Sequence, residues 1–344
     1  MNKKIYLIRS GRTKFGGAEN YLSRLSKALE KENIEHQVLN SSLPKFLPSW
    51  LRSLLFNIQL CFIKQDKFFY SLDRITCPDL YRAGDGVHKV FLSIEKKSKL
   101  NLLHPTYLYL ERRCFNNAKS IIVNSKMVKN EIIKTYDINP NKIDIIYNGI
   151  EFNEVDYQKS FKKLSKEFRL TQNQPIILFV GSGFKRKGVE EFLQIVAMLK
   201  TKGVKAFIVG KEKNFSYYQN ISKKLNIDSH IIFTGPRIDV NDFYTISDIF
   251  LFPTHYDPFS NVVLEAMYFE NAVFTTRSNG ASEILDTDFI MNSPYDKKVA
   301  TSIDNLLSNI ITLNEVKIKN KKISTRFSIE KNLNKTLKVI DKIE

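Results

Sequence analysis

The chain has 344 residues, of which 43% are hydrophobic and 26% are charged, and its formal net charge is +17. This length suits two domains, and the balance of apolar and charged residues excludes a disordered or fibrous protein. No stretch reaches the ~20 apolar residues that span a bilayer, and the first residues read as a buried strand, not as a secretory signal, so we expect a cytoplasmic protein.

The positive charge is concentrated in the first half of the chain. Residues 1–170 carry a net charge of +13, whereas the remaining residues carry +4. Such an excess implies an anionic partner for the first half, and nucleic acid, an anionic membrane or a phosphorylated glycolipid would each serve. The sequence has no zinc-ligand spacing, helix-turn-helix signature or RNA-binding aromatic pattern, so we expect no nucleic-acid partner.

The elements expected in the first half alternate between strand and helix. A strand at residues 4–9 enters a loop that ends in a glycine pair, Gly16 and Gly17, and an amphipathic helix follows. Further strands are expected between helical stretches, at residues 37–39, 67–72, 79–83 and 120–123. This order is typical of a doubly wound α/β domain, which we place at residues 1–152.

A second domain of the same design is expected after a polar, lysine-rich linker at residues 153–172. It occupies residues 173–324 and begins with a strand that enters a glycine turn, in the sequence PIILFVGSG. Four more strands with helical spacing between them follow. The last residues, 325–344, predict a helix with Ser328 as its N-cap.

Two carboxylates flank the start of a predicted helix within residues 252–281. Asp257 and Glu265 are eight positions apart, and the first amides of the helix, at residues 260–262, lack intrahelical acceptors. Such amides suit a diphosphate or a sugar oxygen, and the carboxylates can accept hydrogen bonds from sugar or ribose hydroxyls. The pattern therefore favours a nucleotide sugar; the alternative is a capping Asp and a solvated helix Glu.

This run resembles the acidic-x7-Glu motif of the retaining GT-B glycosyltransferases of family 4, and most of all the bacterial lipopolysaccharide-core glucosyltransferases. It departs from the family at Asp257, where Glu is usual, and at Ser260, where Gly is usual. The resemblance implies an α/β GT-B fold, with two Rossmann-like doubly wound domains facing a central cleft and a C-terminal helix that crosses back to the first domain. It also implies retaining transfer of a hexose, with glucose favoured, from a UDP-sugar.

The glycine turn at residues 181–188 closely resembles the donor-phosphate loop of this family. Arg186 and Lys187 are expected to neutralise the diphosphate as it leaves, and Gly183 lets the backbone approach the ligand. An exposed basic loop is the alternative. The other residues expected to bind the donor are Gly16, Gly17, Lys211, Pro236, Arg237, Asp257, Phe259, Ser260, Asn261 and Glu265.

The acceptor side is expected at residues 81–91, where Asp85 lies between two glycines and His88 follows. In the lipopolysaccharide-core relatives an Asp at this place lies by the reacting carbon, and in many other family members a His does similar work. Asp85 and His88 are therefore catalytic candidates, together with Lys187 and Asp257. The alternatives are an Asx turn at Asp85 and a structural role for His88.

No metal ion or other cofactor is expected, because two fixed cations can neutralise the diphosphate. The three cysteines lack metal-ligand spacing and are expected to be reduced core thiols: Cys61, Cys77 and Cys114. Asp286 and Asp288 form an Asp-x-Asp pattern that metal-dependent transferases of another fold use. Here the pattern follows a helix end, and a solvated turn is the better interpretation.

Two stretches mix apolar and basic residues, at residues 46–63 and 89–113. Both suit peripheral attachment to an anionic inner-membrane surface, with core helices as the alternative. The basic residues of the second stretch would equally suit an anionic glycolipid acceptor: Lys96, Lys97, Lys99, Arg112 and Arg113. We thus expect a hexosyltransferase that extends a lipopolysaccharide or lipooligosaccharide core; a capsular or exopolysaccharide transferase and a nucleotide-sugar epimerase of the same fold are the alternatives.

Overall fold

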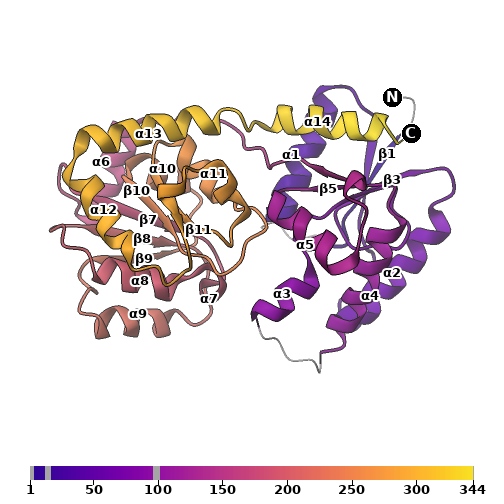
Figure 1. Ribbon diagram of the computed structural model, residues 1–344, viewed down its shortest axis with the longest axis horizontal. Helices are drawn as coiled ribbons and strands as arrows, with labels where there is room; N and C mark the ends of the chain where they lie inside the picture. The colour runs from indigo at the N-terminus through magenta and orange to yellow at the C-terminus, as the bar shows by residue number, and fades with distance from the viewer. Residues whose placement is uncertain (1–3, 12–16, 96–100, 344) are drawn as a thin grey trace. The chain divides into compact units, whose positions relative to one another are not determined.

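The chain forms two compact units, Met1–Gly149 together with Ile329–Glu344, and Ile150–Ser328 (Figure 1). The computed structural model describes residues 4–11, 17–95 and 101–343. The boundaries at 149 and 328 lie a few residues from the expected ones at 152 and 324.

The first unit is built on a parallel six-stranded sheet in the order β2-β1-β3-β4-β5-β6. Its inner strands, such as Phe68–Ser71 and Ser120–Val123, are short runs buried on both faces, as helices on both sides of a parallel sheet require. The strands are β1 (Ile5–Ile8), β2 (His36–Leu39), β3 (Phe68–Ser71), β4 (Leu80–Arg82), β5 (Ser120–Val123) and β6 (Ile143–Ile145). The helices are α1 (Gly17–Lys31), α2 (Ser49–Ile63), α3 (His88–Glu95), α4 (Leu103–Asn117), α5 (Lys126–Tyr136) and α14 (Ile329–Asp341).

The second unit repeats this design, with the parallel strand order β12-β11-β10-β7-β8-β9. Helices α8 and α9 cover one face of the sheet, and α10, α11 and α13 cover the other (Figure 1). The strands are β7 (Ile176–Val180), β8 (Lys205–Val209), β9 (Ile231–Gly235), β10 (Ile249–Phe252), β11 (Ala272–Thr276) and β12 (Ile290–Met291). The helices are α6 (Tyr157–Phe168), α7 (Phe184–Lys187), α8 (Val189–Ala197), α9 (Phe215–Lys224), α10 (Val240–Ile246), α11 (Asn261–Tyr268), α12 (Lys298–Ser308) and α13 (Ile310–Ser324).

Each sheet reverses its strand order beside its first strand. In the second unit the chain runs outward from β7 to β8 and β9, and then returns to the other side of β7 as β10. Connections leave the carboxyl ends of β7 and β10 in opposite directions, which opens the crevice where ligands bind in doubly wound sheets. The loops at residues 181–188 and 253–260 follow these two strands. In the first unit the same reversal occurs between the neighbouring strands β1 and β3.

The segment expected as a linker, residues 153–172, contains helix α6 and belongs to the second unit. Asp156 caps the helix, since its carboxylate accepts a hydrogen bond from the Lys159 amide at 2.8 Å. The buried side of α6 packs on α10, where Ser160 donates a 2.7 Å hydrogen bond to Asp242. The lysines that gave this stretch a linker-like composition lie on the side of the helix that faces solvent. Ser160 and Leu164 lie on its buried side.

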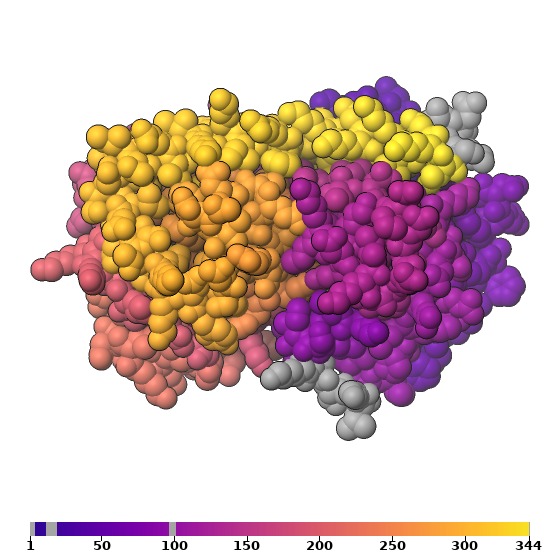
Figure 2. Space-filling view, viewed as in Figure 1, coloured from indigo at the N-terminus to yellow at the C-terminus, as the bar shows by residue number. Residues whose placement is uncertain are grey.

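The C-terminal helix α14 completes the core of the first unit. Its buried residues Leu333, Val339 and Ile340 pack in one cluster with Leu25 and Leu29 of α1. The yellow residues of α12 and α13 instead lie on the surface of the second unit (Figure 2). The chain therefore ends in the unit in which it began.

We predict that Leu333→Ala lowers the free energy of unfolding of the first unit by about 3 kcal/mol, because it leaves a cavity in a core position. Leu333 is 2% exposed, whereas Lys335 on the same helix is exposed. The single tryptophan, Trp50, lies in α2 and reports on this unit by its fluorescence during urea unfolding. Lys335→Ala is the matched control, and an equally small change in both variants would show that α14 is not part of this core.

Candidate functional site

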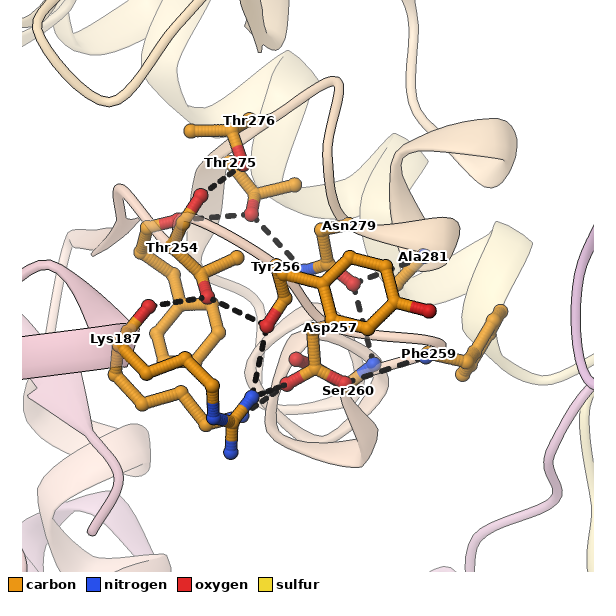
Figure 3. A network of polar contacts seen from close by, with 12 residues as sticks. Lys187, Thr254, Tyr256, Asp257, Phe259, Ser260, Thr275, Thr276, Asn279 and Ala281 are labelled. Carbon is orange, nitrogen blue, oxygen red and sulfur yellow. Dashed lines mark hydrogen bonds and ion pairs between the residues drawn. The ribbon is translucent and has the colours of Figure 1, made fainter. Parts of the chain in front are cut away.

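A buried ion pair lies at the carboxyl edge of the second sheet. The Lys187 ammonium contacts Oδ2 of Asp257, and Nη1 of Arg186 lies 3.8 Å from the same oxygen. The Asp257 side chain is 9% exposed and that of Lys187 is 14% exposed. Figure 3 shows the two side chains directed toward one another from the loops after β7 and β10. The structure thus brings together the two cations and the first carboxylate that the sequence singled out.

The loop after β7 is held tightly against the loop after β10. Gly188 has a φ of +81°, and a Cβ atom there would lie 1.9 Å from the carbonyl oxygen of Pro253, so only glycine fits. The amide of His255 donates a 2.9 Å hydrogen bond to the carbonyl of Arg186, and the Arg186 guanidinium donates to the carbonyl of Tyr256 at 2.7 Å. These contacts position the side chains of Arg186 and Lys187 beside Asp257.

The charges of this cluster favour an ionised carboxylate. Burial alone would raise the pKa of Asp257, but the neighbouring Lys187 and Arg186 outweigh it and hold that pKa below its usual value. Burial also lowers the pKa of Lys187, although Asp257 opposes that shift. Two cations against one carboxylate leave an excess positive charge in a place shielded from water. Such a place suits a polyanion, because the Coulomb energy grows as the effective dielectric falls.

Asn279 joins the loop after β11 to this cluster. Its Oδ1 accepts hydrogen bonds from the amides of Ser260 at 3.2 Å and Ala281 at 3.1 Å, and its Nδ2 donates to Thr275 at 3.0 Å (Figure 3). Residues 257 and 279 also form an isolated parallel bridge. The Ser260 amide, expected among the ligand-facing amides, thus has a hydrogen-bond acceptor within the protein.

Glu265 and the residues beside it lie on the helix that follows Asp257. Glu265 is half-buried in the second turn of α11, and its Oε2 accepts a 3.4 Å hydrogen bond from the buried hydroxyl of Tyr244. The Phe259 amide donates to Oδ1 of Asp257 at 3.2 Å, and Asn261 is the first residue of the helix. Both expected carboxylates thus lie at the carboxyl edge, one before α11 and one on it.

Lys211 lies beside the glycine turn. Its amide donates a 3.1 Å hydrogen bond to Ser182, and its carbonyl accepts one from Gly183 at 3.3 Å, while its side chain is exposed. The Gly183 φ of +75° belongs to the left-handed region, which glycine tolerates at the start of α7.

Arg237 is instead engaged in an ion-pair network of its own. Its guanidinium donates to Glu167 of α6 at 2.7 Å and to Asp239 at 2.8 Å, and Pro236 is exposed beside it. The hydrogen bonds to these carboxylates raise the pKa of Arg237. Both side-chain partners are acidic residues of the same unit, and neither belongs to the Lys187–Asp257 cluster.

In the first unit Arg9 gathers three carboxylates at the point of strand reversal. Arg9 follows β1, and its guanidinium lies 2.6 Å from Asp73, 3.0 Å from Glu19 and 3.7 Å from Asp85. Asp85 is the most exposed of the three, at 51% of its side chain. Arg9 is therefore placed to hold Asp85 at the carboxyl edge, where ligands bind in such sheets.

His88 is the first residue of α3 and is 9% exposed. Its backbone amide donates a 2.8 Å hydrogen bond to the fully buried Glu111, which also accepts one from Arg74 at 2.8 Å. Arg74 in turn donates to the carbonyl of Gly86 at 3.2 Å. Burial, and then the Arg74 cation, lower the pKa of His88 to about 4, so its imidazole is neutral near pH ~7.

Two further expectations concern the N-terminal glycine pair and metal ions. Gly16 lies outside the described residues, and Gly17 is the first residue of α1. Among residues 4–11, 17–95 and 101–343 no group of histidine, cysteine, aspartate and glutamate has the arrangement of a metal site.

The sequence did not point to several residues that hold this site. Each of these residues forms a hydrogen bond or an ion pair with a residue that is distant in the chain: Asn279, Arg9, Arg74 and Glu111. One feature of the sequence could have indicated Arg9. It is a charged residue directly after the first buried strand, and that position lies at the ligand-binding edge of such a sheet.

The fold places the protein in the GT-B class of two doubly wound units. A crystal structure of the lipopolysaccharide glycosyltransferase WaaG superposes with a TM-score of 0.81 at 17% identity, covering 98% of this chain and 99% of that one. Anabaena HepE in complex with UDP-glucose gives 0.76 at 18% identity, covering 98% and 99%.

Residues 160–324 match the family described as glycosyl transferases group 1, and residues 85–154 match Glycosyltransferase Family 4. The chain therefore belongs to the GT-B glycosyltransferases of family 4. It is 30% identical to the capsular polysaccharide biosynthesis glycosyltransferase CapM of Staphylococcus aureus, over 59% of this chain and 56% of that one. It is 26% identical to the lipopolysaccharide glucosyltransferase WaaG of Escherichia coli K12, over 58% and 55%. The matched part thus spans about half the length of these relatives.

We predict that His88→Gln reduces the loss of stability of the first unit in acid. The pKa of His88 is lowered in the folded state, so between pH ~6.5 and ~4 the unfolded chain binds more protons, and stability falls as the pH falls. Between about pH 7 and about pH 4.5 the variant should lose about 2 kcal/mol less than the wild type, as followed by Trp50 fluorescence in urea. Parallel losses in both proteins would mean that His88 titrates normally.

Proposed function

We propose that the protein is a retaining, metal-independent hexosyltransferase that moves a hexose, glucose by preference, from a UDP-sugar to an anionic glycolipid of a lipopolysaccharide or lipooligosaccharide core. The observation that carries this proposal is the buried pair of Lys187 and Asp257, with Arg186 beside it at 3.8 Å. Two cations at the carboxyl edge suit a diphosphate, and an adjacent carboxylate suits sugar hydroxyls.

The proposed roles follow from the charge of each group. In the absence of donor, Asp257 neutralises Lys187. A bound diphosphate competes for the ammonium and releases the carboxylate to accept hydrogen bonds from the sugar. Lys187 and Arg186 then stabilise the charge that grows on the diphosphate as the glycosidic bond breaks, which lowers the barrier because the interaction is strongest in the transition state.

For the acceptor we propose Asp85 as the residue that orients the hydroxyl or stabilises positive charge on the sugar. It is the exposed carboxylate of the Arg9 cluster, and the 3.7 Å ionic contact with Arg9 helps to position it. His88 is neutral and mostly buried, so it suits a supporting role better than that of a charged catalyst. We favour attack on the same face from which the diphosphate leaves, with the departing phosphate taking the acceptor proton.

The identity of donor and acceptor is supported by relatives. HepE, which has the same fold, was crystallised with UDP and with UDP-glucose. WaaG supports a lipopolysaccharide acceptor, and CapM, at 30% identity, supports a capsular polysaccharide acceptor as the second candidate. The basic excess of the first 170 residues agrees with an anionic acceptor in either case.

We predict that Lys187→Ala lowers kcat/KM for UDP-glucose by about 100-fold or more, because one preorganised cation at the leaving group is lost. Lys185→Ala is the matched control, since Lys185 belongs to the same short helix but its side chain is exposed. The measurement is UDP release from a panel of UDP- and GDP-sugars with truncated core glycolipid or capsular precursor as acceptor. Equal activity of the two variants would refute the site, and epimerised donor formed without acceptor would favour an epimerase.

We also propose that the first unit attaches peripherally to the inner membrane from the cytoplasm. Among the described residues no helix is long and apolar enough to cross a bilayer. Phe46 is 84% exposed and Phe62 of α2 is 80% exposed, with Ile58 exposed on the same helix. Exposed aromatic rings favour insertion into the headgroup layer, and nearby basic residues favour anionic lipids. Of the basic residues expected to take part, Arg112 and Arg113 are exposed on α4, whereas Lys96, Lys97 and Lys99 lie outside the described residues.

We predict that replacing Phe46 and Phe62 together by Ser weakens binding to phosphatidylglycerol vesicles by at least about tenfold, because two apolar side chains no longer enter the lipid. Vesicle flotation measures the bound fraction. Ile238→Ser is the control, since Ile238 is a fully exposed apolar residue of the second unit. If the double variant floats as well as the control, this face of α2 does not anchor the protein.

A further inference from the structure

Two cysteines of the first unit bring their sulfur atoms together. Cys61 lies in the last turn of α2, and Cys77 lies in the segment that connects β3 to β4, sixteen positions later. The two Sγ atoms are 2.9 Å apart, less than an ångström beyond the ~2.05 Å of a disulfide bond. Cys61 is exposed and Cys77 is half-buried, so the expectation that both are core thiols is wrong. Only Cys114 is buried.

The surrounding contacts hold both sulfurs in place. Asn57 of α2 is 6% exposed, and its Oδ1 accepts a 2.7 Å hydrogen bond from the Thr76 amide, directly before Cys77. Asn117 donates to the carbonyl of Thr76 at 2.7 Å, and the Thr76 hydroxyl lies 3.3 Å from Cys61 Sγ. The short distance between the sulfurs therefore follows from the packing of α2 on this segment.

A second anchor lies on the other side of the pair. Lys64, directly after α2, forms an ion pair with Asp79, two residues after Cys77. Asp79 also accepts a 2.8 Å hydrogen bond from the Phe69 amide in β3. The end of α2 and the β3–β4 segment are thus joined both before and after the cysteines, and a covalent bond between them needs little movement.

We propose that Cys61 and Cys77 are a thiol-oxidation site, at which a low-molecular-weight disulfide such as oxidised glutathione forms a reversible intramolecular disulfide. The Cys61 thiolate attacks the oxidant and releases one thiol, which leaves a mixed disulfide on Cys61. The Cys77 thiolate then displaces the second thiol and closes the protein disulfide. The pair loses two electrons and two protons, and the oxidant is reduced to two thiols.

The surroundings set the order of these steps. The sulfur of the exposed Cys61 meets the oxidant first. Burial, and then the contact with Cys61, raise the pKa of Cys77 to about 12, so Cys77 stays protonated while Cys61 is free. Conversion of Cys61 to a mixed disulfide removes that contact, and the nearby Lys64 cation favours the Cys77 thiolate that completes the exchange.

The pair lies toward the opposite ends of the strands from the catalytic candidates of the same unit. Asp79 bonds to the first half of β3, so the cysteines lie near the amino ends of the strands. Arg9 and Asp73 follow the carboxyl ends of β1 and β3. Because a cross-link restricts the unfolded chain, oxidation should stabilise the first unit and leave turnover of the donor unchanged. This site does not depend on the proposed reaction.

The test is incubation of the reduced protein with oxidised glutathione, followed by alkylation and peptide mapping without reductant. We expect a 61–77 cross-linked peptide, an alkylatable Cys114, and a rise in Tm of the first unit on the order of 5 °C that dithiothreitol reverses. Trp50 fluorescence follows the transition.

Single variants separate the two steps. Cys77→Ser should accumulate glutathione on Cys61 because the second step is blocked, whereas Cys61→Ser should leave Cys77 unmodified. Cys114→Ser is the matched control and should still form the cross-link. The proposal is overturned if glutathione stays attached to Cys61 in the wild-type protein, as it should in the Cys77→Ser variant. It is also overturned if both Cys61 and Cys77 of the wild-type protein stay alkylatable after incubation with oxidised glutathione. A cross-linked protein with an unchanged or lower Tm would overturn the stabilising role.

Discussion

The second unit is organised around one electrostatic constraint, the Lys187–Asp257 ion pair and the partly exposed Arg186 beside it at the edge of a parallel sheet. Desolvation alone would raise the pKa of Asp257, and the neighbouring Lys187 and Arg186 hold it below its usual value. The loops that carry these groups leave neighbouring strands in opposite directions, and Gly188 lets them touch. Asn279 brings in the loop after β11. Three connections are thereby fixed around a site with more positive than negative charge.

The first unit gathers carboxylates at its own carboxyl edge. Arg9 faces three of them there, and the most exposed is Asp85. The buried Glu111 accepts hydrogen bonds from Arg74 and from the His88 amide at the start of α3. In the proposed reaction the cations of the second unit stabilise the leaving diphosphate, and Asp85 of the first unit orients the acceptor hydroxyl or stabilises positive charge on the sugar.

Much of the fold could be predicted because parallel strands buried on both faces appear as short apolar runs followed by glycine turns. The family and the GT-B fold were confirmed. The local motifs that contain Lys187 and Asp257 could be recognised in the sequence, but not that the two side chains, 70 positions apart, form an ion pair. What local sequence could not reveal were partners distant in the chain, such as Asn279 for the Ser260 amide or Glu111 for Arg74. Helix α6 was also missed, because its exposed lysines outnumber the few residues that it buries.

We propose that the Lys187–Asp257 cluster binds the diphosphate of the donor, and a crystal structure with UDP tests this proposal most directly. We expect diphosphate oxygens within hydrogen-bond distance of Lys187 and Arg186, with the Lys187–Asp257 contact lengthened or broken as the carboxylate is released. A diphosphate bound elsewhere, with that ion pair intact, would contradict it.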